Sequence, residues 1–381
     1  MILILFVVSR FLVLLGAFIA QKTVPYLGFF PYKELLVDFN LPSWISAMAN
    51  FDGIHYLQIA KNGYSQWEQA FFPLFPLLIR IISFIIPNFL VAALVISSVS
   101  FAVGLFFFNK LLINWGIKTF LPIIFLLSFP TAFFFSAVYT EGLFFMLFIL
   151  SLYFLHKKKY TLAGICAALA SSTRLIGIFL IIPFFFHFLA ENMNIFKSFK
   201  FQVSSFKIVL FFPFLGLFSY MIYLWITTGD PLFFINSQPL FGANRSTHLI
   251  FLPQVYFRYF KIIFTATHNF QWYLSLFEMT VFSLVFFVVI LNLFRDLKSK
   301  EMSKQVRHEK VGLDIFSLIN ILLPTLTGTF SSIPRYAIFS FSFFLYLAQI
   351  KSWGIKVGIL AVFITVQIIL LSLFVQGYFV G

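Results

Sequence analysis

The sequence predicts a polytopic α-helical membrane protein, and three observations support this fold class. The mean hydropathy is +1.00, and only 10% of the residues are charged, whereas soluble domains carry roughly 25% charge. Apolar runs near the ~20 residues that cross a ~30 Å hydrocarbon core recur along the whole length. None of these runs alternates apolar and polar residues as the strands of a membrane β-barrel do. A soluble globular protein is therefore excluded.

We expect a single membrane domain over residues 1–381 with about eleven crossings. The predicted spans are 2–20, 88–109, 119–136, 139–155, 161–173, 175–190, 205–226, 273–294, 312–331, 336–350 and 354–376. The first resembles a signal peptide, but Gln21-Lys22-Thr23 is a poor cleavage site, so we expect a retained anchor. The short spans 161–173 and 175–190 meet at 171-SSTR-174 and form either a helical hairpin or one broken helix.

The basic residues predict the orientation of these spans. Sixteen lysines and arginines fall in one alternating set of connections, near residues 110–118, 157–159, 197–207, 295–310 and 351–356, and nine are spread over the longer connections of the other set. Cytoplasmic connections are enriched in these residues, so the first set is predicted to be cytoplasmic. Only the hairpin interpretation keeps every lysine cluster on that side. The N-terminus is then cytoplasmic and the C-terminus is outside.

The connections differ in character. Two long non-cytoplasmic loops, 21–87 and 227–272, are aromatic and moderately polar, and the first contains stretches typical of amphipathic helices at a membrane interface. The cytoplasmic loop 295–310 is charged, and we expect it to be solvated. The net charge of +14 lies in short clusters rather than on one basic face, so we expect membrane lipids and no nucleic acid as partners. The single Cys166 excludes a disulfide framework within the chain.

The stretch 51-FDGIHYLQIAKNGY-64 places ionisable residues in the first outer loop. Asp52, His55 and Tyr56 fall at helical spacing and share one face of a short helix. Nearby hydrocarbon disfavours the charged carboxylate of Asp52, which makes it a stronger base toward a hydroxyl group. His55 could orient that carboxylate, bind a phosphate or help hold a metal. The competing interpretation is that Asp52 only caps the helix that follows.

Four further ionisable residues are predicted on the outer side: Glu141, Arg174, Asp230 and Arg335. Charged groups at membrane depth are costly and point to function. The alternatives are that Glu141 is favoured by a helix dipole and that the arginines reach the headgroups. Guanidinium groups bind phosphate through paired donors. One shared pocket would suit transfer of a sugar from a polyprenyl phosphate, in which Arg174 or Arg335 stabilises the leaving phosphate.

These motifs resemble those of the PIG-V family of GPI mannosyltransferases and its bacterial relatives. The matching segments, in the family's order, are 50-NFDGIHYLQIAKNGY-64 with 70-AFFPLFPLLIR-80, 129-FPTAFFFSAVYTEGLFF-145, 170-ASSTRLIGIFLIIP-183 and 334-PRYAIFSFSFF-344. The resemblance implies a GT-C fold and an inverting, direct transfer from a polyprenyl-phosphate sugar, usually mannose. It implies that Asp52 is the catalytic base. The substrate-binding candidates are His55, Tyr56, Glu141, Arg174, Arg335 and Tyr336.

Several alternatives and partners stay open at this stage. A transporter or lipid-carrier flippase would share the composition, although transporters place their sites near the midplane; an accessory subunit that keeps the pocket without chemistry is another alternative. The acceptor is a lipid-linked or protein hydroxyl, and the prokaryotic plasma membrane is favoured. Arg245 in 238-QPLFGANRS-246 is a third candidate phosphate contact. No cofactor is required, but Asp52, His55, Glu141 and Asp230 have enough donor atoms for one divalent ion if the fold brings them together.

Overall fold

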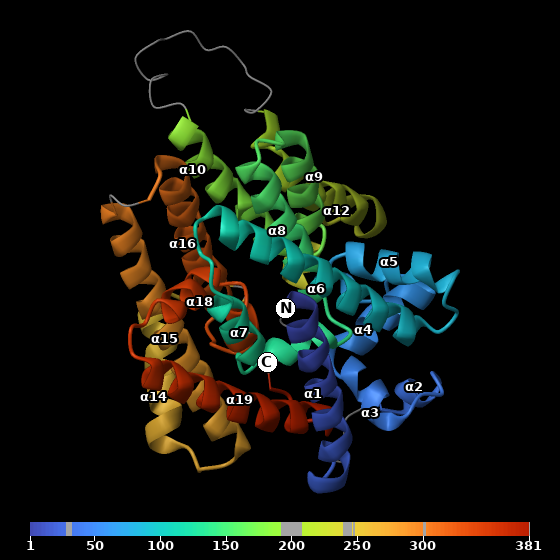
Figure 1. Cartoon of the computed structure of the whole chain (residues 1–381). Helices are drawn as coiled ribbons and strands as arrows, with labels where there is room; N and C mark the ends of the chain where they lie inside the picture. The colour runs from blue at the N-terminus through green and yellow to red at the C-terminus, as the bar shows by residue number, and fades with distance from the viewer. Residues whose placement is uncertain (28–32, 192–207, 239–245, 247, 300–301, 381) are drawn as a thin grey trace.

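The computed structural model describes residues 1–27, 33–191, 208–238, 246, 248–299 and 302–380, and every regular element in these ranges is a helix (Figure 1). The all-α prediction is therefore confirmed. Four helices among the described residues are long and apolar enough to cross a membrane: α1 (Ile2–Thr23), α6 (Phe89–Asn114), α15 (Phe270–Lys298) and α19 (Trp353–Val375). These helices support the assignment to a membrane.

The remaining helices pack among these four. The apolar members are α5 (Leu74–Ser83), α8 (Glu141–His156), α9 (Tyr160–Ser171), η4 (Leu175–Leu180), α10 (Ile181–Glu191) and α12 (Phe212–Thr228). The others are α2 (Lys33–Val37), α3 (Ser43–Ser46), η1 (Ala47–Ala49), α4 (Asp52–Asn62), η2 (Glu68–Ala70), α7 (Leu121–Ser128), η3 (Ala132–Ser136), α13 (Phe233–Asn236), α14 (Leu252–Thr265), α16 (Lys304–Thr325), α17 (Ile333–Ala337) and α18 (Phe341–Ala348).

Two predicted spans are not continuous helices. Segment 119–136 is divided into α7 and η3 around Pro130, because proline lacks the N–H that a continuing helix needs. Segment 336–350 is divided between α17 and α18. There the Tyr336 carbonyl accepts a hydrogen bond from Asn320 Nδ2 at 2.7 Å and another from the Phe339 amide at 3.0 Å. These contacts replace the bonding pattern of a continuous α-helix.

The segment 295–310 also differs from its prediction as a solvated loop. Helix α15 extends to Lys298 and α16 begins at Lys304. Three of the charged side chains, those of Asp296, Glu309 and Lys310, are buried. The charge pattern in the sequence was typical of solvent exposure, but polar groups of neighbouring helices surround the Glu309 carboxylate and satisfy it.

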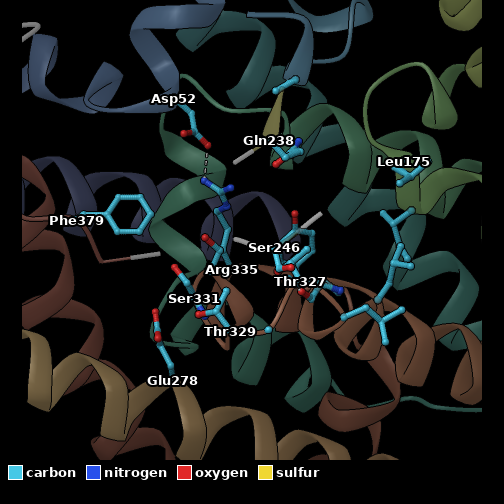
Figure 2. A pocket seen from close by; sticks show the side chains of 18 of the residues that line it. Asp52, Leu175, Gln238, Ser246, Glu278, Thr327, Thr329, Ser331, Arg335 and Phe379 are labelled. Atoms are coloured by element: carbon cyan, nitrogen blue, oxygen red, sulfur yellow. Dashed lines mark hydrogen bonds and ion pairs between the residues drawn. The ribbon is translucent and has the colours of Figure 1, made fainter. Parts of the chain in front are cut away.

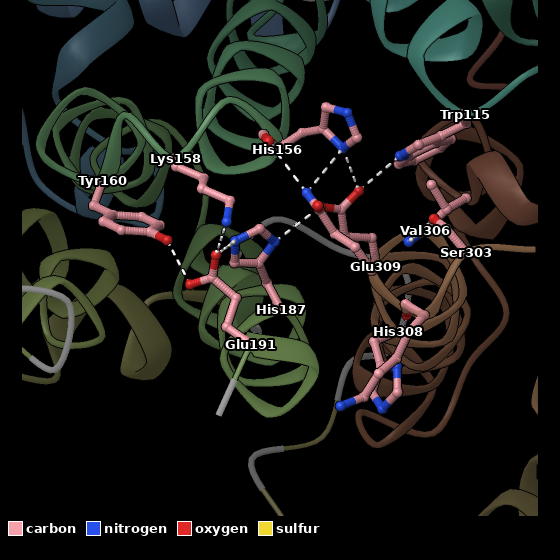
Figure 3. A network of polar contacts seen from close by, with 12 residues as sticks. Trp115, His156, Lys158, Tyr160, His187, Glu191, Ser303, Val306, His308 and Glu309 are labelled. Carbon is pink, nitrogen blue, oxygen red and sulfur yellow. Dashed lines mark hydrogen bonds and ion pairs between the residues drawn. The ribbon is translucent and has the colours of Figure 1, made fainter. Parts of the chain in front are cut away.

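Glu309 is the centre of a polar network between four helices (Figure 3). Trp115 Nε1 donates to Oε2 at 2.8 Å, and His156 Nδ1 lies 2.8 Å from the same oxygen. His187 Nδ1 lies 2.8 Å from Oε1, which also accepts from Gln305 Nε2 at 3.0 Å. Because these residues come from α6, α8, α10 and α16, the carboxylate joins the ends of the four helices at the side of the molecule that carries Lys157, Lys158 and Lys159.

The chain reverses direction at residues 172–174, as the hairpin interpretation predicts. Tyr160, at the start of α9, donates to Glu191 at the end of α10, with 2.5 Å between Oη and Oε2. Lys158 Nζ lies 2.7 Å from the other oxygen of the same carboxylate. The two arms therefore begin and end side by side, and the turn that carries Arg174 lies at their far end.

Candidate functional site

A cavity of about 1080 Å³ lies where the turn of this hairpin meets helices α4 and α14 (Figure 2). Its wall combines the first turn of α4, the start of α8, the turn before η4, helices α14 and α15, and the connection from α16 to α17. Segments from both halves of the sequence thus form one pocket. Asp52, Tyr56, Glu141, Arg174, Arg335 and Tyr336, all predicted as site residues, line it.

Asp52 is the first residue of α4, and its carboxylate is directed into the cavity (Figure 2). Oδ2 accepts a hydrogen bond from Arg335 Nη1 at 2.7 Å. The Asp52 side chain is 25% exposed, whereas that of Arg335 is 10% exposed. Phe51 occupies the N-cap position without a side-chain cap, at φ +59°, a strained backbone conformation for a bulky residue. The Asp52 carboxylate therefore faces the cavity and does not cap the helix.

Glu141 connects the two predicted arginines. Its carboxylate is 1% exposed at the start of α8, and Oε1 accepts a hydrogen bond from Arg174 Nη1 at 2.5 Å. Arg335 Nε lies 3.4 Å from the same oxygen. Asp52, Arg335, Glu141 and Arg174 thus form a chain of alternating charges, in which each buried charge faces an opposite one. The chain leaves several guanidinium N–H groups of both arginines for a bound ligand.

Aromatic rings enclose both guanidinium groups. The Arg174 guanidinium carbon lies 4.9 Å from the ring centre of Tyr336 and 5.3 Å from that of Phe339. The corresponding Arg335 distances are 5.6 Å to Phe134 and 5.4 Å to Tyr139. Cation–π contacts of this kind favour the charged guanidinium and fix its plane. Through these contacts, the phenylalanine-rich stretches beside the motifs help to position the two arginines.

Buried hydrogen bonds between distant segments hold the charged chain in place. Tyr139 donates to the carbonyl of Asn50 at 2.9 Å, which ties the residues before Glu141 to those before Asp52. Thr131 donates to the carbonyl of Pro334 at 2.6 Å, directly before Arg335. Each predicted motif is thus bonded to another, so their relative positions are fixed by the tertiary structure.

A close helix contact sets the position of Glu141. Gly142 follows it, and a Cβ atom at Gly142 would lie 2.4 Å from the carbonyl oxygen of Ser97 on α6. Only glycine permits this approach of two backbones. The start of α8 is thereby pressed against α6, which fixes the position of the neighbouring Glu141.

Tyr56 contributes a neutral phenol to the cavity. Its side chain is buried on α4, where its ring packs edge-on against Phe71 and Phe75. Burial, followed by the charges of Asp52 and Glu141, raises the pKa of Tyr56 well above its ordinary value. The hydroxyl group therefore keeps its proton over the physiological range and can donate a hydrogen bond.

Three other predictions have different outcomes. His55 does not line the cavity: its Nδ1 lies 3.1 Å from Glu68 Oε1, and its ring stacks on Phe71. Asp230, expected in the shared pocket, instead accepts bonds from the Leu232 amide at 2.8 Å and Asn236 Nδ2 at 2.7 Å, as a local turn residue. Arg245 lies outside the described residues.

The convergence of metal ligands is not observed. Among the residues that the structure describes, no group of three or more His, Cys, Asp or Glu side chains is placed to hold a metal ion. His55 and Asp230 have the partners given above, and Glu141 is engaged by the arginines. Of the four donors considered together in the sequence, the fold brings Asp52 and Glu141 to one cavity and leaves His55 and Asp230 outside its lining.

Glu278 is a site residue that the sequence analysis missed. It lies on α15, is 4% exposed and lines the same cavity. Its Oε2 accepts a hydrogen bond from Tyr259 at 2.8 Å. A signal was present, because Glu278 is an isolated acid in an apolar span and such residues point to function. Arg258, His248 and Trp272 also line the cavity and were not predicted.

Comparisons with known proteins add no name to this site. No family model matches the chain, and a search of curated proteins finds no matching relative.

Proposed function

We propose that this protein is a membrane glycosyltransferase that moves a sugar, with inversion, from a polyprenyl-phosphate donor to a hydroxyl group. The observation that carries the proposal is the partly exposed carboxylate of Asp52, held by Arg335 at 2.7 Å in a cavity that also contains Arg174. A base and phosphate-binding groups in one pocket are what direct displacement at an anomeric carbon needs. The resemblance to PIG-V mannosyltransferases favours mannose as the sugar.

The contacts suggest separate roles for the two arginines. Arg335 touches Asp52, so it fits the role of holding the carboxylate in a fixed orientation. Arg174 instead bonds Glu141 and Thr140 at the start of α8. Base and leaving group lie on opposite sides of the reacting carbon in an inverting displacement. Arg174 is therefore the better candidate for the donor phosphate.

The proposed step uses these groups in a simple order. An acceptor hydroxyl oxygen forms a bond to the anomeric carbon while the bond between that carbon and the phosphate oxygen breaks. Asp52 takes the hydroxyl proton, and the polyprenyl phosphate leaves as an anion beside Arg174. No sugar is attached covalently to the protein, and the configuration at the anomeric carbon is inverted.

Helix lengths support a site within reach of membrane lipids. In the proposed topology of about eleven crossings and a GT-C-like fold, the end with Lys157, Lys158 and Lys159 is cytoplasmic. Helix α8 has 16 residues and α9 has 12, which correspond to roughly 24 Å and 18 Å at 1.5 Å per residue. Both are shorter than a hydrocarbon core of about 30 Å. Glu141 and Arg174 would therefore lie below the outer surface, where a lipid phosphate can enter from the outer leaflet.

The experiment is transfer of radiolabel from polyprenyl-phosphate-mannose to membrane lipid or protein by the purified chain in nanodiscs. We expect Asp52→Asn to lower transfer by roughly 10²- to 10⁴-fold, as for loss of a general base. Asp230→Asn is the matched control, because this half-buried aspartate lies outside the cavity lining. Arg174→Gln should raise the donor KM at least tenfold.

Two results would contradict the proposal. Equal transfer by wild type and Asp52→Asn would exclude Asp52 as the base. A wild type that binds the donor but transfers label to no lipid or protein, and that instead moves the intact donor between leaflets, would favour a lipid-carrier flippase.

A further inference from the structure

The cavity has a second polar end around Glu278. Figure 2 shows Glu278 near Ser331 and Thr329, with Arg335 between this group and Asp52. Glu278 is 4% exposed, and one of its oxygens accepts the Tyr259 hydroxyl at 2.8 Å. A buried carboxylate that lines a cavity is costly unless polar groups meet it. The transfer chemistry proposed above leaves this carboxylate without a role.

The Tyr259 hydroxyl has a fixed orientation in this end of the cavity. It lies 3.0 Å from Thr329 Oγ1 and accepts a hydrogen bond from the Phe330 amide at 3.0 Å, in addition to donating to Glu278. The Glu278 carboxylate, which also accepts a hydrogen bond from the Ser332 backbone amide, is therefore held in one orientation. Each carboxylate oxygen can accept two hydrogen bonds, so acceptor positions remain for a ligand. A carboxylate accepts hydrogen bonds from hydroxyl groups and supplies none when ionised.

The remaining wall suits a ring that carries hydroxyl groups. Trp272 lines the cavity and is half-buried; its Nε1 donates to the carbonyl of Ile263 at 3.1 Å, and the His268 ring packs against it with 4.4 Å between ring centres. Asn269, Gln271 and Ser331 add amide and hydroxyl groups to the same lining. A few convergent polar groups beside an aromatic surface are typical of a site for an amphipathic ring such as a sugar.

Position separates this end from the phosphate. Arg174 bonds Thr140 and Glu141 at the start of α8, whereas Glu278 on α15 bonds Tyr259 of α14. In a displacement at the anomeric carbon, the attacking hydroxyl approaches opposite the leaving phosphate. A donor phosphate at Arg174 thus leaves the Glu278 end for the molecule that attacks.

We propose that the Glu278 end of the cavity is the acceptor subsite and that it binds a sugar or polyol ring with neighbouring hydroxyl groups. The Glu278 carboxylate accepts one or two of these hydroxyls, and Trp272 contacts a face of the ring. Calling this end an acceptor subsite rests on the proposed transferase function. The binding of a ring at Glu278 can be tested without measuring transfer.

The test uses octyl α-mannoside as the probe and pentaethylene glycol octyl ether as the control, since the two share an alkyl chain and only one has a sugar ring. Binding to the full chain in nanodiscs is followed by tryptophan fluorescence, and label transfer from polyprenyl-phosphate-mannose to the mannoside is measured alongside. We expect Glu278→Gln to weaken mannoside binding and raise its KM at least tenfold, with the donor KM and the ether's effect unchanged. Glutamine keeps an oxygen for the Tyr259 hydroxyl, so the fold is preserved.

Each outcome separates the subsite from the reaction. If mannoside binds and Glu278→Gln weakens it while wild type transfers no label, the subsite stands and the transferase proposal fails. If label is transferred and Glu278→Gln leaves the mannoside KM unchanged, the subsite is excluded and the transferase proposal stands. If Glu278→Gln raises the donor KM as much as the mannoside KM, Glu278 only supports the Arg335 segment, and the subsite is also excluded.

Discussion

Asp52 and Arg335 lie 283 positions apart in the sequence, yet Arg335 Nη1 donates to Asp52 Oδ2 at 2.7 Å. The same guanidinium approaches Glu141 through Nε at 3.4 Å. One side chain thus joins the start of α4 to the start of α8. A planar guanidinium can meet two carboxylates at once because its donors are fixed at separate positions, whereas an ammonium is a single point charge.

This geometry predicts that Arg335→Lys will not preserve function. The lysine keeps the charge but cannot hold both carboxylates, so we expect transfer to fall by roughly ten- to a hundredfold, the cost of one or two charge-assisted hydrogen bonds. Arg80→Lys is the matched control, because Arg80 bonds the Ala60 carbonyl and does not line the cavity. Initial rates with labelled donor measure both variants, and unchanged activity in Arg335→Lys would exclude the two-carboxylate role.

A larger residue at Gly142 is expected to disturb the site sterically, although Gly142 lies outside the cavity lining. A Cβ atom there would meet the Ser97 carbonyl oxygen at 2.4 Å, so Gly142→Ala should cost about 1–3 kcal/mol of stability through overpacking and should lower transfer by moving Glu141. Gly358→Ala on α19 is the control, because nothing lies within 4 Å of its added Cβ. Thermal unfolding in nanodiscs compares the two, and equal melting temperatures would contradict the close contact.

Glu309 predicts a pH-dependent contribution to stability. Burial raises its pKa, but hydrogen bonds from His156, His187 and Gln305 and the charge of His156 outweigh burial and lower it to about 2. The ordinary value is 4.5, so the carboxylate contributes stability fully above about pH 4.5 and loses it as the pH falls toward 2. The shift corresponds to about 3 kcal/mol.

The measurement is the difference in melting temperature between wild type and Glu309→Gln from pH 7 to pH 3. We expect the largest difference at pH 5 and above and a smaller one at pH 3. Glu34→Gln is the control, since this carboxylate is exposed on the short helix α2. A difference that grows as the pH falls would have the wrong sign and would contradict the assigned network.

The proposed orientation is testable with two cysteines in a Cys166→Ala background. The substitutions are Lys159→Cys, at a position before α9, and Gln66→Cys, at a position between α4 and η2. Both positions are exposed. An impermeant thiol reagent should label Gln66→Cys in intact cells, whereas Lys159→Cys should require opened membranes. Labelling of both in intact cells, or the reverse pattern, would place the Asp52 end of the cavity on another side.

The membrane class and many of the motif residues could be predicted from the sequence, because these depend on composition and on local order. Mean hydropathy and apolar runs predicted helices, and the spacing of Asp52, Glu141, Arg174 and Arg335 in their motifs marked four residues that do line one cavity. The chain reversal around Arg174 was also predicted from the sequence. Only a hairpin there places every lysine cluster on the same predicted side of the membrane.

Tertiary packing decided the rest. Which arginine meets Asp52, the exclusion of His55 and Asp230 from the pocket and the inclusion of Glu278 all depend on how helices distant in sequence pack together. Local periodicity carries no information about these contacts, since a helix face shows only which residues point the same way. The break in the predicted span 336–350 has the same origin, because a hydrogen bond from Asn320 to the Tyr336 carbonyl replaced a bond of a continuous helix.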